Sequence, residues 1–262
     1  MPALEHAAPV AEPLTRPLRA SARAWATAAL DLVFPALCPV CDATLGPGRR
    51  DPLCGACWSA IRRLTPPCCA ACGLPLPAFE PAAAPGPARC GACATKTPVW
   101  DWARAAAEYE GVTRDAIHAL KFHGRRGLAR PLAALLVETC RDALAGDVAA
   151  LVPVPLGRAR ERDRGFNQAA LIAELLAPFA AVPVRPVLER IRYTTTQTAY
   201  DRAERMENLR GAFRLRKKQD VRGLHVLLID DVLTTGSTLS ECARVLRRAG
   251  AVSVHAATAA RA

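Results

Sequence analysis

Residues 227–239 read LLIDDVLTTGSTL, and this is the most informative stretch of the chain. Its apolar residues predict a buried strand that ends at Ile229, and two adjacent acids, Asp230 and Asp231, follow the strand. A turn rich in hydroxyl groups and glycine then leads into a helix. This order places two carboxylates at the carboxyl end of a strand and free backbone N–H groups at the start of a helix.

The turn has the features of a phosphate site. The first N–H groups of a helix have no partner within it, and the helix dipole favours an anion there. Gly236 lets the backbone approach a phosphate closely. The candidate phosphate-binding residues are Thr234, Thr235, Gly236, Ser237 and Thr238. Asp230 and Asp231 supply acceptors for two sugar hydroxyls, and carboxylates are also ligands that suit Mg²⁺.

Two common nucleotide-binding motifs are absent from the chain. The turn has no lysine and no GxxxxGK[ST] sequence occurs, which excludes a P-loop. No GxGxxG sequence occurs either, which disfavours a dinucleotide fold. The alternative interpretation is an ordinary turn between a strand and a helix, with a solvated acid pair and a Thr or Ser helix cap.

Length and net charge limit the possible domain organisation and the possible ligands of the chain. The chain has 262 residues, which is enough for one core domain and a small module. Its formal net charge of +11 suits anionic ligands such as phosphates or nucleic acid, although a compositional bias explains it equally well. No segment is apolar enough over its length to span a bilayer. We interpret residues 1–34 as a tail and a short amphipathic helix, and expect a cytoplasmic protein.

The chain has 11 cysteines, eight of which form four C-x-x-C pairs. In a reducing compartment this pattern predicts two structural Cys₄ Zn²⁺ sites, because each pair supplies two thiolates to one tetrahedral ion. Consecutive pairing forms one site from Cys38, Cys41, Cys54 and Cys57, and the other from Cys69, Cys72, Cys90 and Cys93. Interleaved pairing, an iron–sulfur cluster and a redox dithiol are the alternatives. Cys140 and Cys242 fall on apolar helix faces and are expected in the core.

Beyond the cysteines, strand patterns alternate with helix patterns. This alternation predicts an α/β fold, a Rossmann-like, mostly parallel sheet with helices on both faces. The expected strands are 103–109, 149–154, 184–188, 224–229 and 252–257. The expected helices are 113–122, 128–144, 167–179 and 239–249. Ligands of such sheets lie beyond the carboxyl ends of the strands.

Two further segments are therefore expected near the acid pair. Proline stiffens the chain at the end of strand 149–154. The guanidinium groups of arginines in the same loop can bind pyrophosphate oxygens in a bidentate way. The candidate pyrophosphate loop comprises Pro153, Val154, Pro155, Arg160 and Arg164. We interpret Arg158 and Arg162 as part of a solvated helix start. The second segment, residues 189–213, is polar and long enough to close over a reactive sugar, or to be a plain linker.

Taken in order, these features resemble the ComF family, a double zinc ribbon followed by a type I phosphoribosyltransferase domain. The markers are FPALCPVC, CAACGLPL, CGAC, EYEG with ALKFHG, PVPLGRARERDRGFNQA, QTAYDRAERMENLRGAF and LLIDDVLTTGSTL. The resemblance implies a zinc ribbon over 35–98 and a phosphoribosyltransferase domain over 99–262. Within that domain it implies that Asp230, Asp231 and 234–238 bind 5-phosphoribosyl-1-pyrophosphate (PRPP). It also implies a flap that carries Gln197, Arg205 and Asn208.

Three functions follow from this resemblance. The first is an enzyme that uses PRPP and Mg²⁺ to transfer phosphoribose to a nitrogen acceptor, with Asp230 and Asp231 as its catalytic acids and an acceptor pocket under the zinc module. The second is a competence protein that associates with single-stranded DNA or with the DNA-uptake machinery. The third is a PRPP-sensing regulator without turnover. Release of pyrophosphate separates the first from the third.

Overall fold

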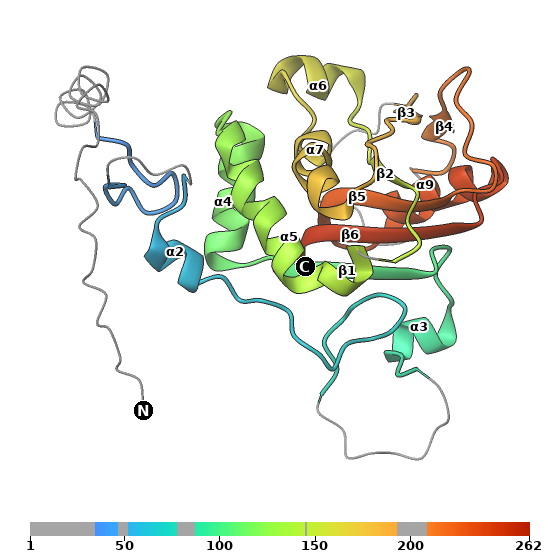
Figure 1. The fold of residues 1–262 in the computed structure, drawn as a ribbon, viewed down its shortest axis with the longest axis horizontal. Helices are drawn as coiled ribbons and strands as arrows, with labels where there is room; N and C mark the ends of the chain where they lie inside the picture. The colour runs from blue at the N-terminus through green and yellow to red at the C-terminus, as the bar shows by residue number, and fades with distance from the viewer. Residues whose placement is uncertain (1–34, 47–51, 78–86, 145, 193–208) are drawn as a thin grey trace, which may run out of the picture.

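The computed structural model describes residues 35–46, 52–77, 87–144, 146–192 and 209–262. The tail and helix expected over 1–34 lie outside the described residues. Four parallel strands form the central sheet in the order β1-β6-β5-β2 (Figure 1). They are β1 (Trp102–Glu108), β2 (Ala150–Pro153), β5 (His225–Leu233) and β6 (Ser253–Arg261). The predicted parallel α/β sheet is therefore confirmed.

Helices cover both faces of this sheet, because side chains alternate between the faces along each strand. Leu227 and Ile229 of β5 belong to the hydrophobic cluster on one face, and Val226 and Leu228 belong to the cluster on the other. The helices of the first face are α4 (Gly111–Phe122), α5 (Ala129–Leu144) and α7 (Gln168–Ala180), with the short η2 (Arg126–Leu128). The helix of the second face is α9 (Ser237–Arg248).

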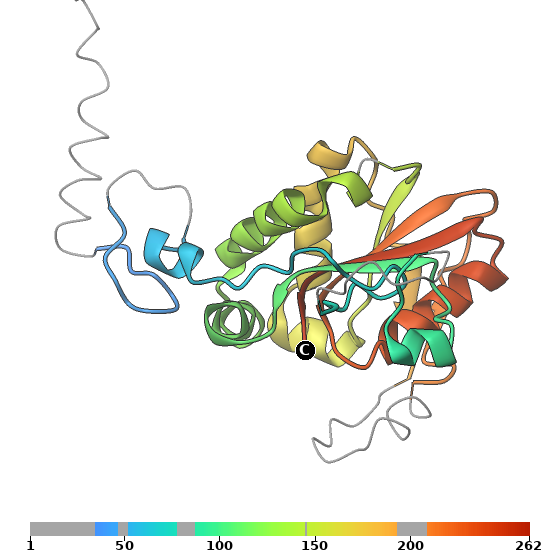
Figure 2. The ribbon, with the colours of Figure 1, turned by 90° about the horizontal axis from the view of Figure 1, so that it is seen from below.

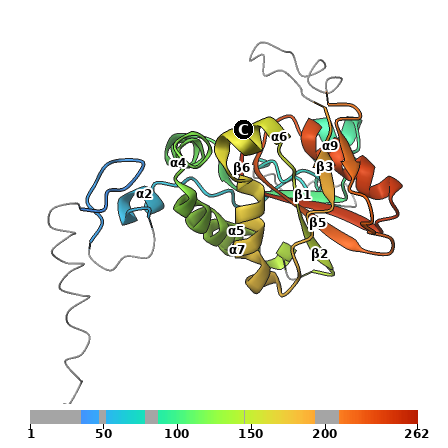
Figure 3. The ribbon, with the colours of Figure 1, turned by 90° about the horizontal axis from the view of Figure 1, so that it is seen from above.

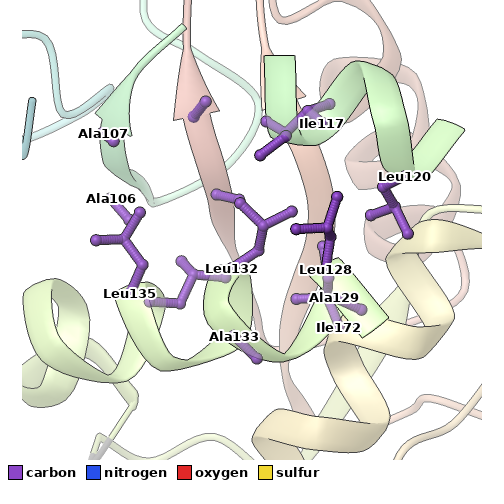
Figure 4. Packing of buried hydrophobic residues seen from close by; sticks show 14 of the residues in the cluster. Ala106, Ala107, Ile117, Leu120, Leu128, Ala129, Leu132, Ala133, Leu135 and Ile172 are labelled. Carbon is purple, nitrogen blue, oxygen red and sulfur yellow. The ribbon is translucent and has the colours of Figure 1, made fainter. Parts of the chain in front are cut away.

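The core of the first face is built from leucine, isoleucine and alanine (Figure 4). Leu132 and Leu135 of α5 lie beneath Ala106 of β1, and Ile172 of α7 lies beside Leu128. Burial of a leucine or isoleucine side chain contributes roughly 1.5–3 kcal/mol. The two clusters together hold β5 rigidly, and β5 is the strand that carries the acid pair.

Strand β5 is longer than its sequence pattern predicts. We expected it to end at Ile229, but it continues through both acids to Leu233. The reason is its neighbour, because β6 also continues and pairs Asp230 with Thr258 and Leu233 with Arg261. The acids are thus fixed by strand pairing on one side instead of lying in a free turn.

The strand expected at 184–188 is also wrong in its bounds. Val184 makes only an isolated bridge to Leu151, and the strand β3 spans Leu188–Arg190. It pairs antiparallel with β4 (Phe213–Leu215) in a separate two-stranded sheet. This small sheet stands beside α6 (Arg158–Arg164), above the β2 edge of the main sheet (Figures 1 and 3).

The cysteine-rich segment lies along the opposite part of the molecule, with α2 (Gly55–Ser59) beside α4 and α3 (Gly91–Thr95) below β1 (Figures 1 and 2). Its backbone pairs with the edge strand β1. The N–H of Leu64 donates to the carbonyl of Ala106 at 2.9 Å, and the N–H of Ala103 donates to that of Ala71 at 2.9 Å. The segment is therefore joined to the sheet by main-chain hydrogen bonds.

Candidate active site

The acid pair lies near the carboxyl end of β5. Asp231 is buried, with 4% of its surface exposed, and its carboxylate forms an ion pair with the Lys121 ammonium of α4. The Asp230 carboxylate accepts a hydrogen bond from the Asp231 N–H at 2.9 Å. Burial raises the pKa of Asp230 well above its usual range, and the negative charge of Asp231 raises it further. Two acids this close to each other form a site that attracts a cation or a donor of several hydrogen bonds.

Basic side chains from three different elements surround these acids. Lys121 comes from the end of α4, Arg164 from α6 and Arg190 from β3. Arg164 interacts electrostatically with Asp231 and donates to the Gln168 carboxamide at 2.6 Å. Arg190 interacts electrostatically with Asp230. The site therefore combines acceptors for hydroxyl groups with cations for phosphate oxygens.

Sequence reasoning did not assign a role to Lys121 or Arg190. Lys121 stands in the ALKFHG marker, but its partner is 110 positions away, and local spacing carries no information about that contact. Arg190 lies in the segment interpreted as a closing loop, whereas it belongs to a strand. Both residues are brought to the acids by the packing of α4 and β3 against the central sheet.

The turn after β5 has the glycine turn and the helix start that the sequence predicts. Gly236 has a φ of 75° and precedes the first turn of α9 as a cap residue without a side chain, and the Ser237 N–H donates to the Thr235 hydroxyl at 3.4 Å. The hydroxyls of Thr235 and Ser237 lie 2.8 Å apart and face each other. Thr234 is exposed and Thr238 is partly exposed. The first turn of a helix leaves further N–H groups for an external acceptor, so phosphate binding here stays a prediction beside the alternative of an ordinary turn with a Thr or Ser cap.

The candidate pyrophosphate loop begins where β2 ends. The Val154 N–H donates to the Ile229 carbonyl at 2.9 Å, and the side-chain amide of Asn167 donates to the Val154 carbonyl at 3.0 Å. Pro153, Val154 and Pro155 are buried, so this part of the loop is rigid. Arg160 and Arg164 are partly buried, whereas Arg158 and Arg162 are exposed as expected. The expected flap residues Gln197, Arg205 and Asn208 lie outside the described residues.

The eight paired cysteines form two separate clusters. The first contains Cys38, Cys41, Cys54 and Cys57, and the second contains Cys69, Cys72, Cys90 and Cys93. Consecutive pairing is therefore correct, and interleaved pairing is wrong. Cys140 and Cys242 are buried core residues, as expected.

The geometry of these clusters suits structural zinc. Sulfur atoms lie 3.5 Å apart between Cys41 and Cys54, and 3.7 Å apart between Cys72 and Cys90. Tetrahedral Zn–S bonds of about 2.3 Å place sulfur atoms roughly 3.8 Å apart, whereas a disulfide needs about 2 Å. Burial raises the pKa of the Cys69 thiol, but backbone N–H donors, that of Cys90 foremost, lower it to about 6. Such a thiol is a ready thiolate ligand.

Comparison with known proteins agrees with this two-part architecture. Residues 29–94 match the double zinc ribbon domain family, and residues 163–262 match the phosphoribosyl transferase domain family. The DNA utilization protein YhgH of Salmonella typhimurium is 35% identical over 228 residues, which are 85% of this chain and 96% of that protein. Competence protein F of Haemophilus influenzae is 32% identical over 207 residues, 77% of this chain and 86% of the relative.

The chain belongs to the ComF family. Competence protein ComFC of Bacillus subtilis is 29% identical to it over 76% of this chain and 80% of the relative. Among solved structures, the glutamine PRPP amidotransferase of B. subtilis aligns with 52% of this ComF chain and 26% of its own. The identity over that alignment is 23% and the TM-score is 0.33. Among the described residues of this family member, no helix has the length and apolar content needed to cross a membrane.

Proposed function

We propose that this ComF-family protein binds PRPP and transfers its phosphoribosyl group to a nitrogen acceptor, with release of pyrophosphate. One observation carries the proposal: an acid pair on β5 is followed within five residues by a glycine turn and the start of a helix. The phosphate of PRPP would lie on the N–H groups and hydroxyls of 234–238. The ribose hydroxyls would donate to Asp230 and Asp231, and the pyrophosphate would face Arg160 and Arg164.

In this reaction the protein positions the two reactants and stabilises the charge that develops on the leaving group. The acceptor nitrogen donates its lone pair to C1 of the ribose while the bond from C1 to the pyrophosphate oxygen breaks, and that electron pair leaves with pyrophosphate. An acceptor that attacks through an N–H group then loses its proton to solvent. The cationic side chains at the site stabilise the leaving group, because its charge develops as the bond breaks. Lys121 holds Asp231 in place for the sugar.

The acid pair also fits Mg²⁺, which accompanies PRPP. Carboxylate oxygens are the protein ligands that Mg²⁺ prefers, and two negative charges beside each other are relieved by a divalent cation. Asp230 and Asp231 would hold the ion directly or through water. Bound there, Mg²⁺ would neutralise charge on the pyrophosphate.

Isothermal titration with PRPP and Mg²⁺ tests binding. We expect measurable heat with the wild-type protein and at least a tenfold weaker affinity for Asp231→Asn. The matched control is Asp147→Asn, because Asp147 is exposed and lies before β2, at the opposite end of the strands. No heat with the folded wild-type protein, or equal losses for both variants, would contradict the proposal. A screen for pyrophosphate release across nitrogen bases then separates an enzyme from a PRPP-sensing regulator.

A second candidate function is an association with single-stranded DNA, in the cytoplasm, as part of DNA uptake. It is supported by the names of two relatives, DNA utilization protein and competence protein F, and by the net charge of +11. Binding through phosphate contacts weakens steeply as salt rises. A gel-shift assay over a salt series tests it, and the absence of any shift at low salt would remove this candidate.

A further inference from the structure

A second hollow adjoins the proposed PRPP site and shares Pro155 and Arg190 with it, but most of its lining lies outside that site. Its volume is about 450 Å³, within the range of roughly 300–1,000 Å³ that small-molecule sites occupy. Its walls come from the loop after β2, the start of α6, and the small sheet of β3 and β4. The lining includes Pro155, Arg158, Asn167, Arg190, Arg216 and Lys217.

The walls of this hollow, the β3–β4 cavity, are strongly basic. Five arginine or lysine side chains line it, against two glutamates. Glu189 is already engaged, because it accepts from Arg214 at 2.8 Å and lies 3.7 Å from Arg158. The bond from Arg214 and the nearby guanidinium charges keep the pKa of Glu189 below its usual range, so this glutamate stays ionised. The cavity keeps an excess of positive charge after this pairing.

Several of the basic groups are directed by contacts with the small sheet. Arg216 donates through Nε to the Leu188 carbonyl at 3.0 Å, and this hydrogen bond fixes the position of its guanidinium group. Lys217 follows directly and is exposed. Arginine and lysine held around a concave surface recognise carboxylate or phosphate groups through charge-assisted hydrogen bonds.

Arg190 connects this cavity to the acid pair. It lines the cavity and also interacts electrostatically with Asp230, and its guanidinium lies 5.5 Å from the centre of the Phe213 ring. Pro155, a candidate pyrophosphate residue, and Leu156, which follows it, line the same cavity. A ligand seated there would therefore lie close to a sugar held by Asp230. The phosphate ends of PRPP are assigned elsewhere, to 234–238 and to Arg160 and Arg164.

We propose that the β3–β4 cavity binds the nitrogen acceptor and that this acceptor carries an anionic group, a carboxylate or a phosphate, which the cavity's basic side chains recognise. The proposal rests on the proposed function and names its substrate class. It also places the acceptor at the β2 edge of the sheet, whereas the sequence suggested a pocket under the zinc module at the β1 edge.

Matched probes test the charge preference on the full-length protein. Orotate and uracil share a ring and differ by one carboxylate, and nicotinate and nicotinamide differ in the same way. Inorganic phosphate probes the other anion. We expect calorimetric binding of the carboxylates or of phosphate, and affinities at least tenfold weaker for the uncharged partners.

Paired variants locate the binding. Lys217→Ala should weaken anion binding about tenfold, and Lys217→Arg should restore it. Lys218→Ala is the control, because Lys218 is the next residue, carries the same charge and does not line the cavity. PRPP affinity should be unchanged in all three variants, so it reports on the proposed function separately.

Each outcome decides between alternatives. A stronger effect with phosphate than with carboxylates supports the anionic cavity and identifies the group. Equal binding of charged and uncharged probes, or equal effects of Lys217→Ala and Lys218→Ala, would overturn the inference while PRPP binding stands. Single-stranded DNA that binds tightly and displaces the small anions would also overturn it, in favour of a nucleic-acid surface.

Discussion

The indole ring of Trp100 lies directly against Gly236. A Cβ atom at position 236 would come within 2.7 Å of the ring, which is closer than real Cβ atoms approach other groups. The same indole donates through its N–H to the carbonyl of Ala71 at 2.9 Å, and Ala71 stands between Cys69 and Cys72. One buried tryptophan thus connects the second cysteine cluster with the turn assigned to phosphate.

This contact predicts that Gly236→Ala is costly. Alanine at a φ of 75° loses roughly 1–2 kcal/mol, and here the methyl group also meets the Trp100 ring. We expect a larger loss of unfolding free energy than for Gly223→Ala, whose φ is 73° but whose Cβ position is open. Urea denaturation measures both. Equal losses would show that the Trp100 contact does not matter.

Loss of zinc from the two cysteine clusters should affect PRPP binding unequally. Intact protein should contain two zinc ions per chain by elemental analysis, since two Cys₄ clusters are present. We expect Cys72→Ser to lower the affinity for PRPP more than Cys41→Ser, because only the second cluster is joined to Gly236 through Ala71 and Trp100. Equal effects of the two variants on PRPP binding would contradict this coupling.

The ion pair between Lys121 and Asp231 predicts a large loss of stability when Lys121 alone is replaced. Lys121→Met leaves a buried carboxylate without its cation, a change that costs about 3 kcal/mol or more in buried pairs. The double variant with Asp231→Asn should recover much of that loss, because no charge is then left unpaired. Urea unfolding of both single variants and the double variant measures the coupling. Additive losses would argue against a direct pair.

The raised pKa of Asp230 predicts that Asp230→Asn increases the stability of the folded protein, by an amount that depends on pH. Burial and the charge of Asp231 raise the pKa in the folded state above the unfolded value of about 3.9. The folded state therefore binds the proton more tightly, and the wild type loses stability as the pH rises above the unfolded pKa. Asparagine does not titrate and can still accept from the Asp231 N–H.

Urea unfolding at several pH values checks this prediction. We expect Asp230→Asn to be more stable than the wild type near neutral pH, with a difference that shrinks as the pH falls towards about 4. PRPP binding should fall in the same variant, because the carboxylate is assigned to the sugar. A stability difference that grows on acidification would contradict the assigned pKa direction.

The alternation of strand and helix patterns predicted the parallel α/β fold, LLIDDVLTTGSTL predicted a glycine turn and a helix after a strand, and the four C-x-x-C pairs predicted two metal clusters. These features are local: a helix start after a strand and two thiols on one tight turn depend on residues a few positions apart. The consecutive grouping of the cysteines, by contrast, depends on how the four C-x-x-C turns lie in the fold.

Tertiary structure alone decided the surroundings of the acid pair. The extension of β5 to Leu233 depends on pairing with β6. The ion pair of Lys121 with Asp231 and the electrostatic interaction of Arg190 with Asp230 depend on how α4 and β3 pack. The β3–β4 cavity likewise exists only because strands from either side of residues 191–212 pair with each other. The chain's own pattern determined which chemistry is present, because that chemistry sits in contiguous residues. Long-range packing decided which charges meet, because no local spacing encodes a contact between distant elements.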